Sequence, residues 1–538
     1  MRDLILTGFM GTGKTTVGRI LARRHCLEFV DSDDEIERRA GCTIAEYWQR
    51  HEEPAFRDLE HEIMRDLLVE GEGRIIATGG GALAHQRNRD LVTQGRQIIC
   101  LTCPTDQLID RLQAEQSVRP ALAGLNREQI RHDIERQLDA RALAYGLYEQ
   151  VDTGGRSYEA VADEIAERYV LSSFEYRFGP ERATRVTFVG SATEGIPRVL
   201  EAHGLAGVLE LVTDENVREL VLDAKLTAGL RRDELGEAPW KWGCVVFPAG
   251  EEHKSLETLE AVYRSCTLHG VDRSSTIVGI GGGVICDIAG FAAATYMRGI
   301  RLVLIPTTLL AQADAAIGGK TAVDVGGVKN LAGAFYPAEL IVVCPDVLES
   351  LSDAGLADGL TEILKSAAVR CERLLREVER LDAPREILGK PFIIRRSAEL
   401  KARVVEADPY ERAREGGRAM LNFGHTIGHG VEAASEYRLS HGQAISIGML
   451  AETWLAERNG IAPVGLRDRL ATVLTRFGQP ASAPDLDPDT VFERMLGDKK
   501  RLGGRIRFAL PTAPGEGAVF DVSERDARAA VSVAVEGI

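Results

Sequence analysis

The stretch Leu4-Ile5-Leu6-Thr7-Gly8-Phe9-Met10-Gly11-Thr12-Gly13-Lys14-Thr15 runs from a short apolar strand into a glycine-rich loop. It contains the complete pattern GxxxxGK[ST], and a helical apolar spacing follows at Val17, Ile20 and Leu21. In this strand–loop–helix setting, backbone N–H groups surround phosphates, the lysine reaches the β- and γ-phosphates, and the hydroxyl ligates Mg²⁺. The stretch therefore predicts a nucleoside triphosphate site on a parallel α/β domain, and leaves the acceptor open.

Two carboxylates follow the next apolar strand, in Phe29-Val30-Asp31-Ser32-Asp33. If the strand continues, Asp31 and Asp33 alternate with Ser32 and point the same way. One carboxylate would then hold Mg²⁺ through water, and the other would accept hydrogen bonds from substrate hydroxyls. The alternative is a helix N-cap before Glu35-Ile36-Glu37.

Three further motifs, together with the loop and the Asp-Ser-Asp, resemble shikimate kinase over residues 1–170. They are Phe56-Arg57, Gly79-Gly80-Gly81 and Val118-Arg119-Pro120, the last in a polar stretch that resembles a lid. The resemblance implies ATP-dependent phosphorylation of the shikimate 3-hydroxyl. It assigns ATP to Gly11, Thr12, Gly13, Lys14, Thr15, Thr16 and Arg119, Mg²⁺ to Thr15 and Asp31, shikimate to Asp33, Arg57, Gly80, Gly81 and Arg141, and catalysis to Lys14, Asp33 and Arg119. Arg141 departs from the family's Arg-x-x-Leu-Tyr spacing.

Length and composition limit the classes of protein that remain. The chain has 538 residues, enough for two to four domains, and a net charge of −16, which argues against nucleic-acid and membrane-surface partners. Nine scattered cysteines without a CxxC pair suit a reducing cytosol. Residues 1–8 resemble a strand rather than a signal peptide, and no apolar run approaches the roughly 18 residues of a membrane span. We expect a soluble cytoplasmic protein that acts on small molecules.

Four segments are predicted along the chain. They are a P-loop domain at 1–171 with helices on both faces of a parallel sheet, a linker at 172–182, a Rossmann-like α/β domain at 183–349, and a mostly helical metal- and substrate-binding domain at 350–538. The linker is placed where Gly179-Pro180 interrupts a stretch without helical period. Strands at 186–189, 209–213 and 244–247 alternate with helices, which predicts a parallel sheet.

A histidine cluster dominates the last segment, in Leu421-Asn422-Phe423-Gly424-His425-Thr426-Ile427-Gly428-His429, with His441 beyond it. On a helix, His425 and His429 share a face because they are four residues apart. With Glu362, two imidazoles and one carboxylate make the usual ligand set of a catalytic zinc. Solvated histidines are the alternative. A peptidase is excluded, since Thr426 stands where that motif needs glutamate.

Glycine turns and lysines suggest anion binding between these landmarks. The turn Gly281-Gly282-Gly283 follows a predicted strand and precedes a helix, where a pyrophosphate could bind; tight packing is the alternative. Lys320, Asn330 and Lys365 could converge on a substrate phosphate, whereas solvation is the default for lysines.

Nine motifs in order then resemble 3-dehydroquinate synthase over about 183–538, including Gly-Gly-Gly-Val-x-x-Asp, Pro-Thr-Thr-Leu-Leu-Ala-Gln, Leu-Asn-Phe-Gly-His-Thr-x-Gly-His and Asp-Lys-Lys. The resemblance implies conversion of 3-deoxy-D-arabino-heptulosonate 7-phosphate to 3-dehydroquinate and phosphate, with NAD⁺ regenerated in each turnover. It also implies a homodimer through this part of the chain.

The resemblance carries over three sets of residues. Zinc, or Co²⁺, would be held by Glu362, His425 and His441. NAD would be held by Asp214, Asn216, Glu251, Lys254, Gly282, Gly283, Asp287, Thr307, Thr308, Lys320 and Lys329. Substrate would meet Arg298, Asp314, Lys320, Asn330, Lys365, Lys401, Arg418, Asn422, His429 and Lys499 or Lys500. The catalytic set would be Lys320, Lys365, His429, Arg298, Asn330, Arg418, Asn422 and Glu411, with Glu415 as the alternative to Glu411.

Two other functions remain open. The second part could be a metal-dependent polyol dehydrogenase, although its lysines and its Asp-Lys-Lys favour a phosphorylated substrate. The first part could be a nucleotide-sensing module without phosphoryl transfer, although its full set of charged residues favours a kinase.

Overall fold

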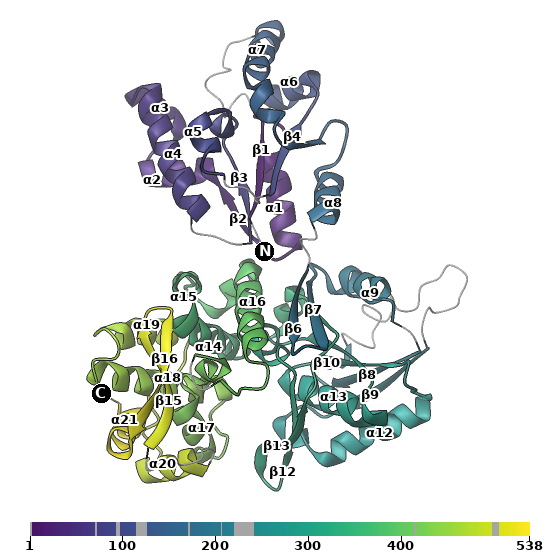
Figure 1. The fold of residues 1–538 in the computed structure, drawn as a ribbon, viewed down its shortest axis with the longest axis vertical. Helices are drawn as coiled ribbons and strands as arrows, with labels where there is room; N and C mark the ends of the chain where they lie inside the picture. Colours follow the sequence, from purple (N-terminus) through teal and green to yellow (C-terminus); the bar gives the residue numbers. More distant parts are fainter. Residues whose placement is uncertain are drawn as a thin grey trace. The chain divides into compact units, whose positions relative to one another are not determined.

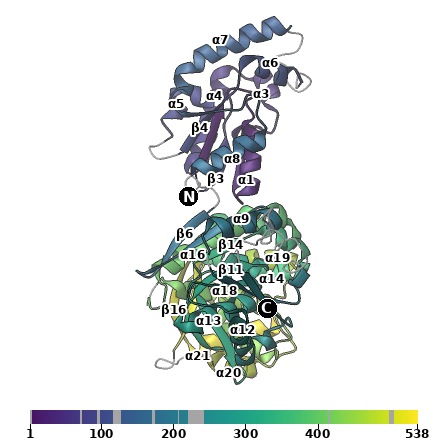
Figure 2. The ribbon, with the colours of Figure 1, turned by 90° about the vertical axis from the view of Figure 1, so that its right-hand side faces the viewer.

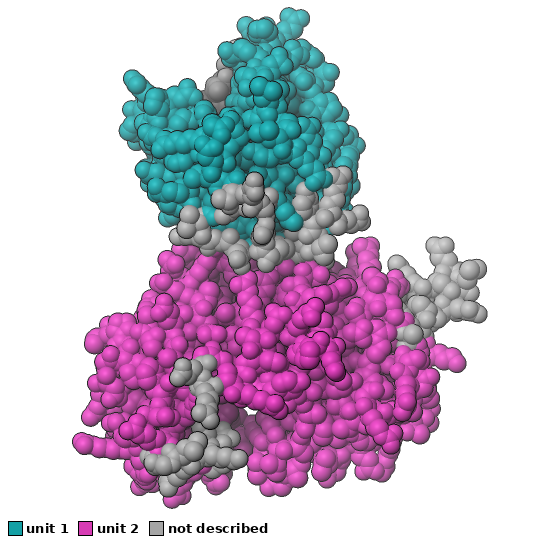
Figure 3. Space-filling model, in the orientation of Figure 1, with its two compact units in different colours: residues 1–172 teal, residues 173–538 magenta. Residues whose placement is uncertain are grey.

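The computed structural model describes residues 3–69, 73–92, 97–114, 126–169, 173–205, 207–219, 241–413, 416–497 and 505–537. It divides into two compact units, residues 1–172 and 173–538, which Figure 3 colours separately. Each unit has its own sheet and its own buried core. Within these ranges, no helix combines the length and the apolar character that crossing a membrane requires.

The first unit is a five-stranded sheet in the order β2-β3-β1-β4-β5, and every neighbouring pair is parallel. Successive side chains of β1 point to opposite faces. Leu6 packs with Val17 of α1 on one face, and Ile5 packs with Met64 of α4 on the other. Helices therefore cover both faces, which confirms the predicted P-loop architecture (Figures 1 and 2).

The strands of this unit are β1 (Leu4–Gly8), β2 (Glu28–Asp31), β3 (Arg74–Ala77), β4 (Gln97–Thr102) and β5 (Glu149–Asp152). Its helices are α1 (Lys14–Arg24), α2 (Ser32–Ala40), α3 (Ile44–Arg50), α4 (Glu53–Val69), α5 (Gln86–Arg89), α6 (Thr105–Ala114), α7 (Arg127–Tyr145) and α8 (Tyr158–Tyr169), with a 3₁₀ turn η1 (Ala82–Ala84).

The second unit is built on a seven-stranded sheet in the order β6-β7-β14-β11-β10-β8-β9. All neighbouring pairs are parallel except the first, where β6 runs antiparallel to β7. The strands are β6 (Ser173–Phe178), β7 (Arg182–Phe188), β8 (Val208–Asp214), β9 (Lys241–Phe247), β10 (Thr276–Gly281), β11 (Arg301–Pro306) and β14 (Leu340–Val343).

The predicted linker at 172–182 differs from this structure. Ser173–Phe178 is strand β6, and Gly179-Pro180 lies in the hairpin turn that joins it to β7. The stretch has no helical period because its residues alternate as in a strand, with Tyr176 and Phe178 buried. The Tyr176 hydroxyl also accepts a hydrogen bond from the N–H of Gly318, at 3.1 Å.

Around this sheet lie α9 (Ala192–Ala202), α12 (Leu256–His269), α13 (Gly283–Thr295) and the short turns η4 (Glu251–His253), η5 (Tyr296–Arg298) and η7 (Pro345–Ser350). A π-helical turn η6 (Ala311–Ala315) leads to a separate antiparallel hairpin, β12 (Lys320–Val325) with β13 (Val328–Phe335). This hairpin carries several of the predicted binding residues.

The last part of the chain is mostly helical, as predicted. It contains α14 (Asp353–Arg370), α15 (Glu372–Glu379), α16 (Pro391–Ala407), α17 (His425–Ala434), α18 (His441–Arg458), α19 (Leu466–Arg476), α20 (Pro488–Gly497) and α21 (Glu524–Glu536), with the 3₁₀ turns η8 (Pro384–Gly389) and η9 (Arg418–Asn422). One antiparallel hairpin, β15 (Arg505–Ala513) with β16 (Glu516–Ser523), completes it.

A buried ion pair secures the first unit where β3 begins. The Arg74 guanidinium, 2% exposed, donates to Oδ2 of Asp3 at 2.8 Å and to the carbonyl of Leu67 at the end of α4. The Asp3 carboxylate is fully buried. The pair therefore joins α4 to the edge of the sheet where β1 and β3 start.

Replacing Arg74 with methionine leaves the Asp3 carboxylate buried without its cation, a change that costs about 3–5 kcal/mol. We expect the first unit to unfold at lower urea concentration, measured by hydrogen exchange of β1 and β3 peptides, with the second unit unchanged. The control is Arg65→Met, which removes an exposed pair at 3.4 Å on α4 and should cost less than about 0.5 kcal/mol. Equal stability of the two variants would contradict this interpretation.

Candidate active sites

The loop between β1 and α1 closes around the Lys14 ammonium, which donates to the carbonyl oxygens of Gly8 at 2.9 Å and Phe9 at 3.0 Å. Gly13 has a left-handed φ of 91° and precedes α1 with no side-chain cap. A Cβ at Gly13 would lie 2.4 Å from the Tyr158 ring, so a larger residue does not fit. The start of α1 is thereby left for a phosphate.

Thr15 and Asp31 meet beside this loop, where the Thr15 hydroxyl donates to Oδ2 of Asp31 at 2.7 Å. Asp31 is also the N-cap of α2, because its Oδ1 accepts from the N–H of Asp33 at 3.1 Å. The expectation that Asp31 and Asp33 alternate along a strand is wrong. β2 ends at Asp31, and Asp33 lies in the first turn of α2.

Asp33 is half-buried beside the glycine turn that follows β3. Burial, followed by the negative charge of Asp31, raises the pKa of Asp33 to about 6. A Cβ at Gly79 would lie 2.6 Å from Oδ1 of Asp33, and the Gly79 N–H donates to Oγ of Ser32 at 2.8 Å. A carboxyl group with a pKa near neutrality is suited to accept a proton from a substrate hydroxyl.

Two arginines from distant helices converge on the same turn. A Cβ at Gly81 would lie 3.5 Å from Nη1 of Arg57 on α4 and 3.9 Å from Nη2 of Arg141 on α7. Arg141 also donates to the carbonyl of Gly80 at 3.1 Å. Glu60, a buried carboxylate 3.0 Å from Arg57, is not among the predicted residues, although its i,i+3 spacing from Arg57 indicates the contact. Paired guanidinium groups suit a carboxylate ligand.

The other predicted residues of the first unit are Gly11, Thr12, Thr16 and Arg119. Thr12 is buried, with its hydroxyl donating to Phe9 at 2.8 Å, and Thr16 is exposed on the first turn of α1. Gly11 has a left-handed φ of 80°. Arg119 lies in residues 115–125, outside those that the structure describes.

In the second unit, α14, α17 and α18 bring Glu362, His425 and His441 together, with one ligand atom of each within 4.8 Å of the others. Nε2 of His441 lies 3.4 Å, and Nε2 of His425 3.8 Å, from Oε1 of Glu362. Ligands about 2.1 Å from a tetrahedral zinc are about 3.4 Å apart. Oε1 of Glu362 is buried without a hydrogen-bond partner among the described residues, so a cation would satisfy it. This donor set fits zinc.

Helix caps hold both imidazoles in place. His425 is the first residue of α17, after Gly424 with a left-handed φ of 76°. The buried Glu452 accepts from the N–H of Gly424 at 2.7 Å. His441 is the first residue of α18, and Ser440 is the N-cap of that helix. Each of the two imidazoles is thus positioned by the start of a helix.

The charges around the cluster are strongly coupled. Burial favours the neutral form of Glu362, but the charge of Lys365 and then of the histidines holds the pKa of Glu362 well below its usual value. Burial and the charge of Lys365 keep the pKa of His425 well below 6.5. For His441, the contacts with the carboxylates of Glu362 and Glu432 outweigh burial and raise the pKa to about 10. An ionised carboxylate therefore sits among nitrogen ligands.

Lysines extend this network toward the sheet. Lys365 donates to Oε2 of Glu362, and Lys401 donates to Oδ1 of Asp314 at 2.7 Å. Asp314 lies on the π-helical turn η6, a distortion that is frequent at functional sites. Burial lowers the pKa of Lys401 to about 8, although Asp314 opposes this shift.

Glu411 joins the β12–β13 hairpin to the helical part. Its Oε2 accepts from Lys320 at 2.5 Å and its Oε1 from Asn422 at 3.0 Å, while Arg418 is buried nearby at 4% exposure. Glu411 has a left-handed φ of 54°, a strained conformation that occurs at functional sites. The alternative, Glu415, lies outside the described residues.

A second binding region forms where the parallel strands β8, β10 and β11 end at one edge. Lys254, 5% exposed, contacts Oδ2 of Asp287 and Oδ1 of Asn330, each at 2.5 Å. Burial raises the pKa of Asp287 to about 6, although the charge of Lys254 opposes this shift. Gly282 precedes α13 without a side-chain cap, so the helix start fits a pyrophosphate. These residues fit a dinucleotide.

The other predicted cofactor residues lie along this edge. The Asn216 N–H donates to Oδ1 of Asp214 after β8, at 2.9 Å. Gly283 is the first residue of α13, and Thr307 and Thr308 follow β11. Oε1 of Glu251 lies 3.9 Å from the ammonium groups of both Lys254 and Lys329.

His429 completes the histidine group, with its ring centroid 5.0 Å from that of His425 and 6.0 Å from that of His441. Glu432, which is not among the predicted residues, follows His429 by three residues on α17 and contacts Lys329 and His441. The i,i+3 spacing could have indicated it.

Among the described residues, the predicted substrate residue Arg298 is not joined to this cluster. Arg298 is exposed after α13, a 13-residue helix that separates it from the Gly283 turn by about 20 Å. Lys499 and its alternative Lys500 lie outside the described residues.

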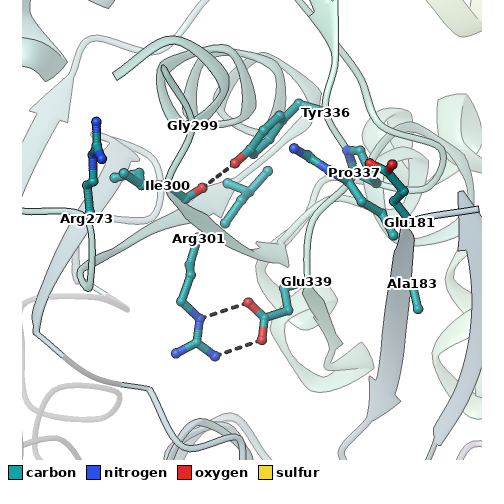
Figure 4. A pocket seen from close by; sticks show the side chains of 11 residues that line it. Glu181, Ala183, Arg273, Gly299, Ile300, Arg301, Tyr336, Pro337 and Glu339 are labelled. Carbon is teal, nitrogen blue, oxygen red and sulfur yellow. Dashed lines mark hydrogen bonds and ion pairs between the residues drawn. The ribbon is translucent and has the colours of Figure 1, made fainter. Parts of the chain in front are cut away.

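A separate cavity of about 400 Å³ lies near the amino-terminal ends of β7 and β11, and no predicted site residue lines it. Figure 4 shows Arg301 there, paired with Glu339 through two contacts of 2.8 Å, and the Tyr336 hydroxyl on the Ile300 carbonyl. These polar side chains satisfy one another.

Three family models match the chain in order. "Shikimate kinase" matches residues 10–170, "3-dehydroquinate synthase N-terminal" residues 244–358, and "3-dehydroquinate synthase C-terminal" residues 359–501. The bifunctional shikimate kinase/3-dehydroquinate synthase of Thermotoga maritima is 32% identical over 514 residues, which cover 94% of this chain and 95% of that protein. The 3-dehydroquinate synthase of Symbiobacterium thermophilum is 43% identical over 312 residues, covering 57% of this chain and 84% of that protein.

A solved structure resembles the second unit. A 2-epi-5-epi-valiolone synthase from Streptomyces hygroscopicus, with NAD⁺ and Zn²⁺ bound, is 27% identical with a TM-score of 0.58, over 66% of this chain and 98% of that one.

Replacing Glu362 with glutamine removes the only carboxylate of the donor set and should weaken zinc binding by at least about 10- to 100-fold. Zinc affinity is measured by chelator competition, which does not depend on turnover. Glu349→Gln, an exposed change just before α14, is the control and should bind zinc as the natural chain does. Unchanged affinity in the Glu362 variant would place the ion elsewhere.

Proposed function

The chain belongs to the family of bifunctional shikimate kinase/3-dehydroquinate synthases, and we propose that each compact unit holds one of the two active sites. It phosphorylates shikimate with ATP to give shikimate 3-phosphate. It also converts 3-deoxy-D-arabino-heptulosonate 7-phosphate to 3-dehydroquinate and phosphate with recycled NAD. We assign the kinase to residues 1–171 and, because β6 pairs within the second sheet, the synthase to 173–538, with the NAD region ending near 349.

The observation that carries the proposal is that each unit brings together a set of donor groups from distant parts of its own sequence. In the first unit these are the phosphate loop, the Thr15–Asp31 pair and the two arginines at Gly81. In the second they are the buried Oε1 of Glu362 and two imidazoles facing it. Neither a nucleotide sensor nor a polyol dehydrogenase explains both sets, and the family membership favours neither.

In the kinase site, Lys14 and the start of α1 would hold the ATP phosphates. Mg²⁺ bound by Thr15 and Asp31 would neutralise phosphate charge during transfer. Arg57 and Arg141 would hold the shikimate carboxylate, because two guanidinium groups offer parallel donors. Asp33 would accept the proton of the attacking hydroxyl, and catalysis would be mainly positioning and charge stabilisation.

In the synthase site, Glu362, His425 and His441 would hold zinc or cobalt, both of which accept such ligands. When bound, the metal polarises substrate hydroxyls, and NAD takes and returns a hydride. Lys254, Asp287 and the Gly282 turn would hold NAD against the strand ends.

The lysines complete the assignment. Lys320, Lys365 and Asn330, with Lys401 behind them, would surround the substrate phosphate and stabilise its departure. His429 and Glu411 would contact the reacting ring, where hydrogen bonds to developing charge have the largest effect. We further propose that the chain works in the cytoplasm as a homodimer through its second unit.

The decisive assay follows phosphate release by the full chain with the heptulosonate phosphate, zinc and a catalytic amount of NAD⁺. We expect phosphate in many-fold excess over NAD⁺ and none with EDTA. Lys14→Met should lose kinase activity by at least about 100-fold and keep synthase activity, and Glu362→Gln should do the reverse. Accumulation of NADH from a polyol without phosphate release would contradict the synthase assignment.

Kinase activity should depend on the ionisation of Asp33. Because its pKa is raised to about 6, the carboxylate that accepts the proton is lost below that pH, and kcat/KM for shikimate should fall about tenfold per pH unit. Asp33→Asn should lower kcat by about 10²- to 10⁴-fold at pH 8 and leave synthase activity unchanged. An Asp33→Asn enzyme with the natural rate and pH profile would exclude Asp33 as the base.

A further inference from the structure

One carboxylate in the second unit contacts both a proposed metal ligand and a proposed cofactor residue. Oε1 of Glu432 accepts from Nζ of Lys329 at 2.9 Å, and Oε2 lies 3.3 Å from Nδ1 of His441. Glu432 is only 6% exposed, at the end of α17. Lys329 lies 103 residues earlier, on β13 of the hairpin in the α/β part.

The contact with Glu432 orients His441. When Nδ1 donates to the carboxylate, the lone pair of Nε2 faces Oε1 of Glu362, as metal binding requires. His425 is oriented differently, since its Nδ1 lies 3.2 Å from the backbone carbonyl of Phe423. Of the two imidazoles, only His441 is therefore oriented by a charged group that a second binding site also uses.

The Lys329 side of this contact is also built by the end of α17. Tyr437 places its ring 4.4 Å from Nζ of Lys329, an attractive cation–π distance. The backbone N–H of Tyr437 donates to the carbonyl of Glu432 at 3.1 Å. Glu436 and Tyr437 both have left-handed φ values, 53° and 59°, a strained conformation for residues other than glycine. A strained turn thus holds Lys329 on both sides.

We propose that Glu432 is a positioning residue that couples metal binding to NAD binding. The inference rests on the proposed synthase function of this unit. A metal ion bound to His441 fixes the orientation of its imidazole, and the imidazole then fixes the carboxylate of Glu432. That carboxylate in turn holds Lys329 and its hairpin against the helical part. Because coupling between two sites is reciprocal, NAD bound at Lys329 tightens the metal by the same factor.

Another interpretation makes Glu432 a ligand, because His429, Glu432 and His441 also have ligand atoms within 4.8 Å of one another. The Lys329 ammonium argues against it, since it lies 2.9 Å from the carboxylate and repels a second cation. Because Glu432 is then not a ligand of a second ion, the proposed coupling requires one zinc ion per chain.

The test measures zinc affinity with and without NAD, by chelator competition on the full chain, for the natural chain, Glu432→Gln and Lys329→Met. We expect NAD to tighten zinc about 5- to 150-fold in the natural chain and less than twofold in both variants. Glu432→Gln should also weaken zinc about 10- to 100-fold without NAD, whereas Lys329→Met should not. The different zinc affinities of the two variants without NAD distinguish the orientation of His441 from the coupling between NAD and zinc.

Two controls keep the outcome unambiguous. Glu436→Gln removes the same charge from an exposed position four residues on and should keep the coupling. Shikimate kinase activity reports an intact first unit in every sample. Failure of the natural chain to bind zinc or to release phosphate would overturn the proposed function. Normal turnover with no NAD–zinc coupling, with coupling that survives in Glu432→Gln, or with two zinc ions per chain would overturn this inference alone.

Discussion

The second unit depends on one buried carboxylate. Glu362 lies within α14 at 2% exposure, and an ionised carboxylate in a protein interior must be paired or must bind a metal. Lys365 supplies one partner from the same helix, while His425 and His441 face it from the starts of α17 and α18. Because these three helices must converge to satisfy one charge, packing of the helical part and formation of the site are the same event.

The two proposed phosphate-binding sites share one structural feature. In each, a glycine replaces the capping side chain of the helix at the binding edge, Gly13 before α1 and Gly282 before α13. By contrast, Thr43 before α3 and Ser255 before α12 each cap their helix with a side-chain oxygen. A missing cap leaves backbone N–H groups unsatisfied, which is unfavourable for the helix and favourable for a phosphate.

Local sequence was sufficient for the phosphate loop and for the alternation of strands and helices that predicts the parallel sheets, because each of these elements is encoded in a short continuous segment. It was insufficient where the contact spans the chain. Nothing near Glu432 in the sequence indicates Lys329, and the meeting of Arg57 and Arg141 at Gly81 follows only from the family resemblance. The Asp31–Asp33 geometry was misread because a strand end and a helix start share the same polar residues.

The hairpin that begins the second unit has a protective consequence. β6 is the edge strand of the seven-stranded sheet, and it covers β7, whose N–H and C=O groups would otherwise offer a template to a second molecule. Charged Glu175 and Arg177 are exposed on β6, which discourages such pairing, while Tyr176 supports the turn that leads to Lys320. The segment that connects the two units therefore protects the sheet of the second unit from pairing edge to edge with another molecule.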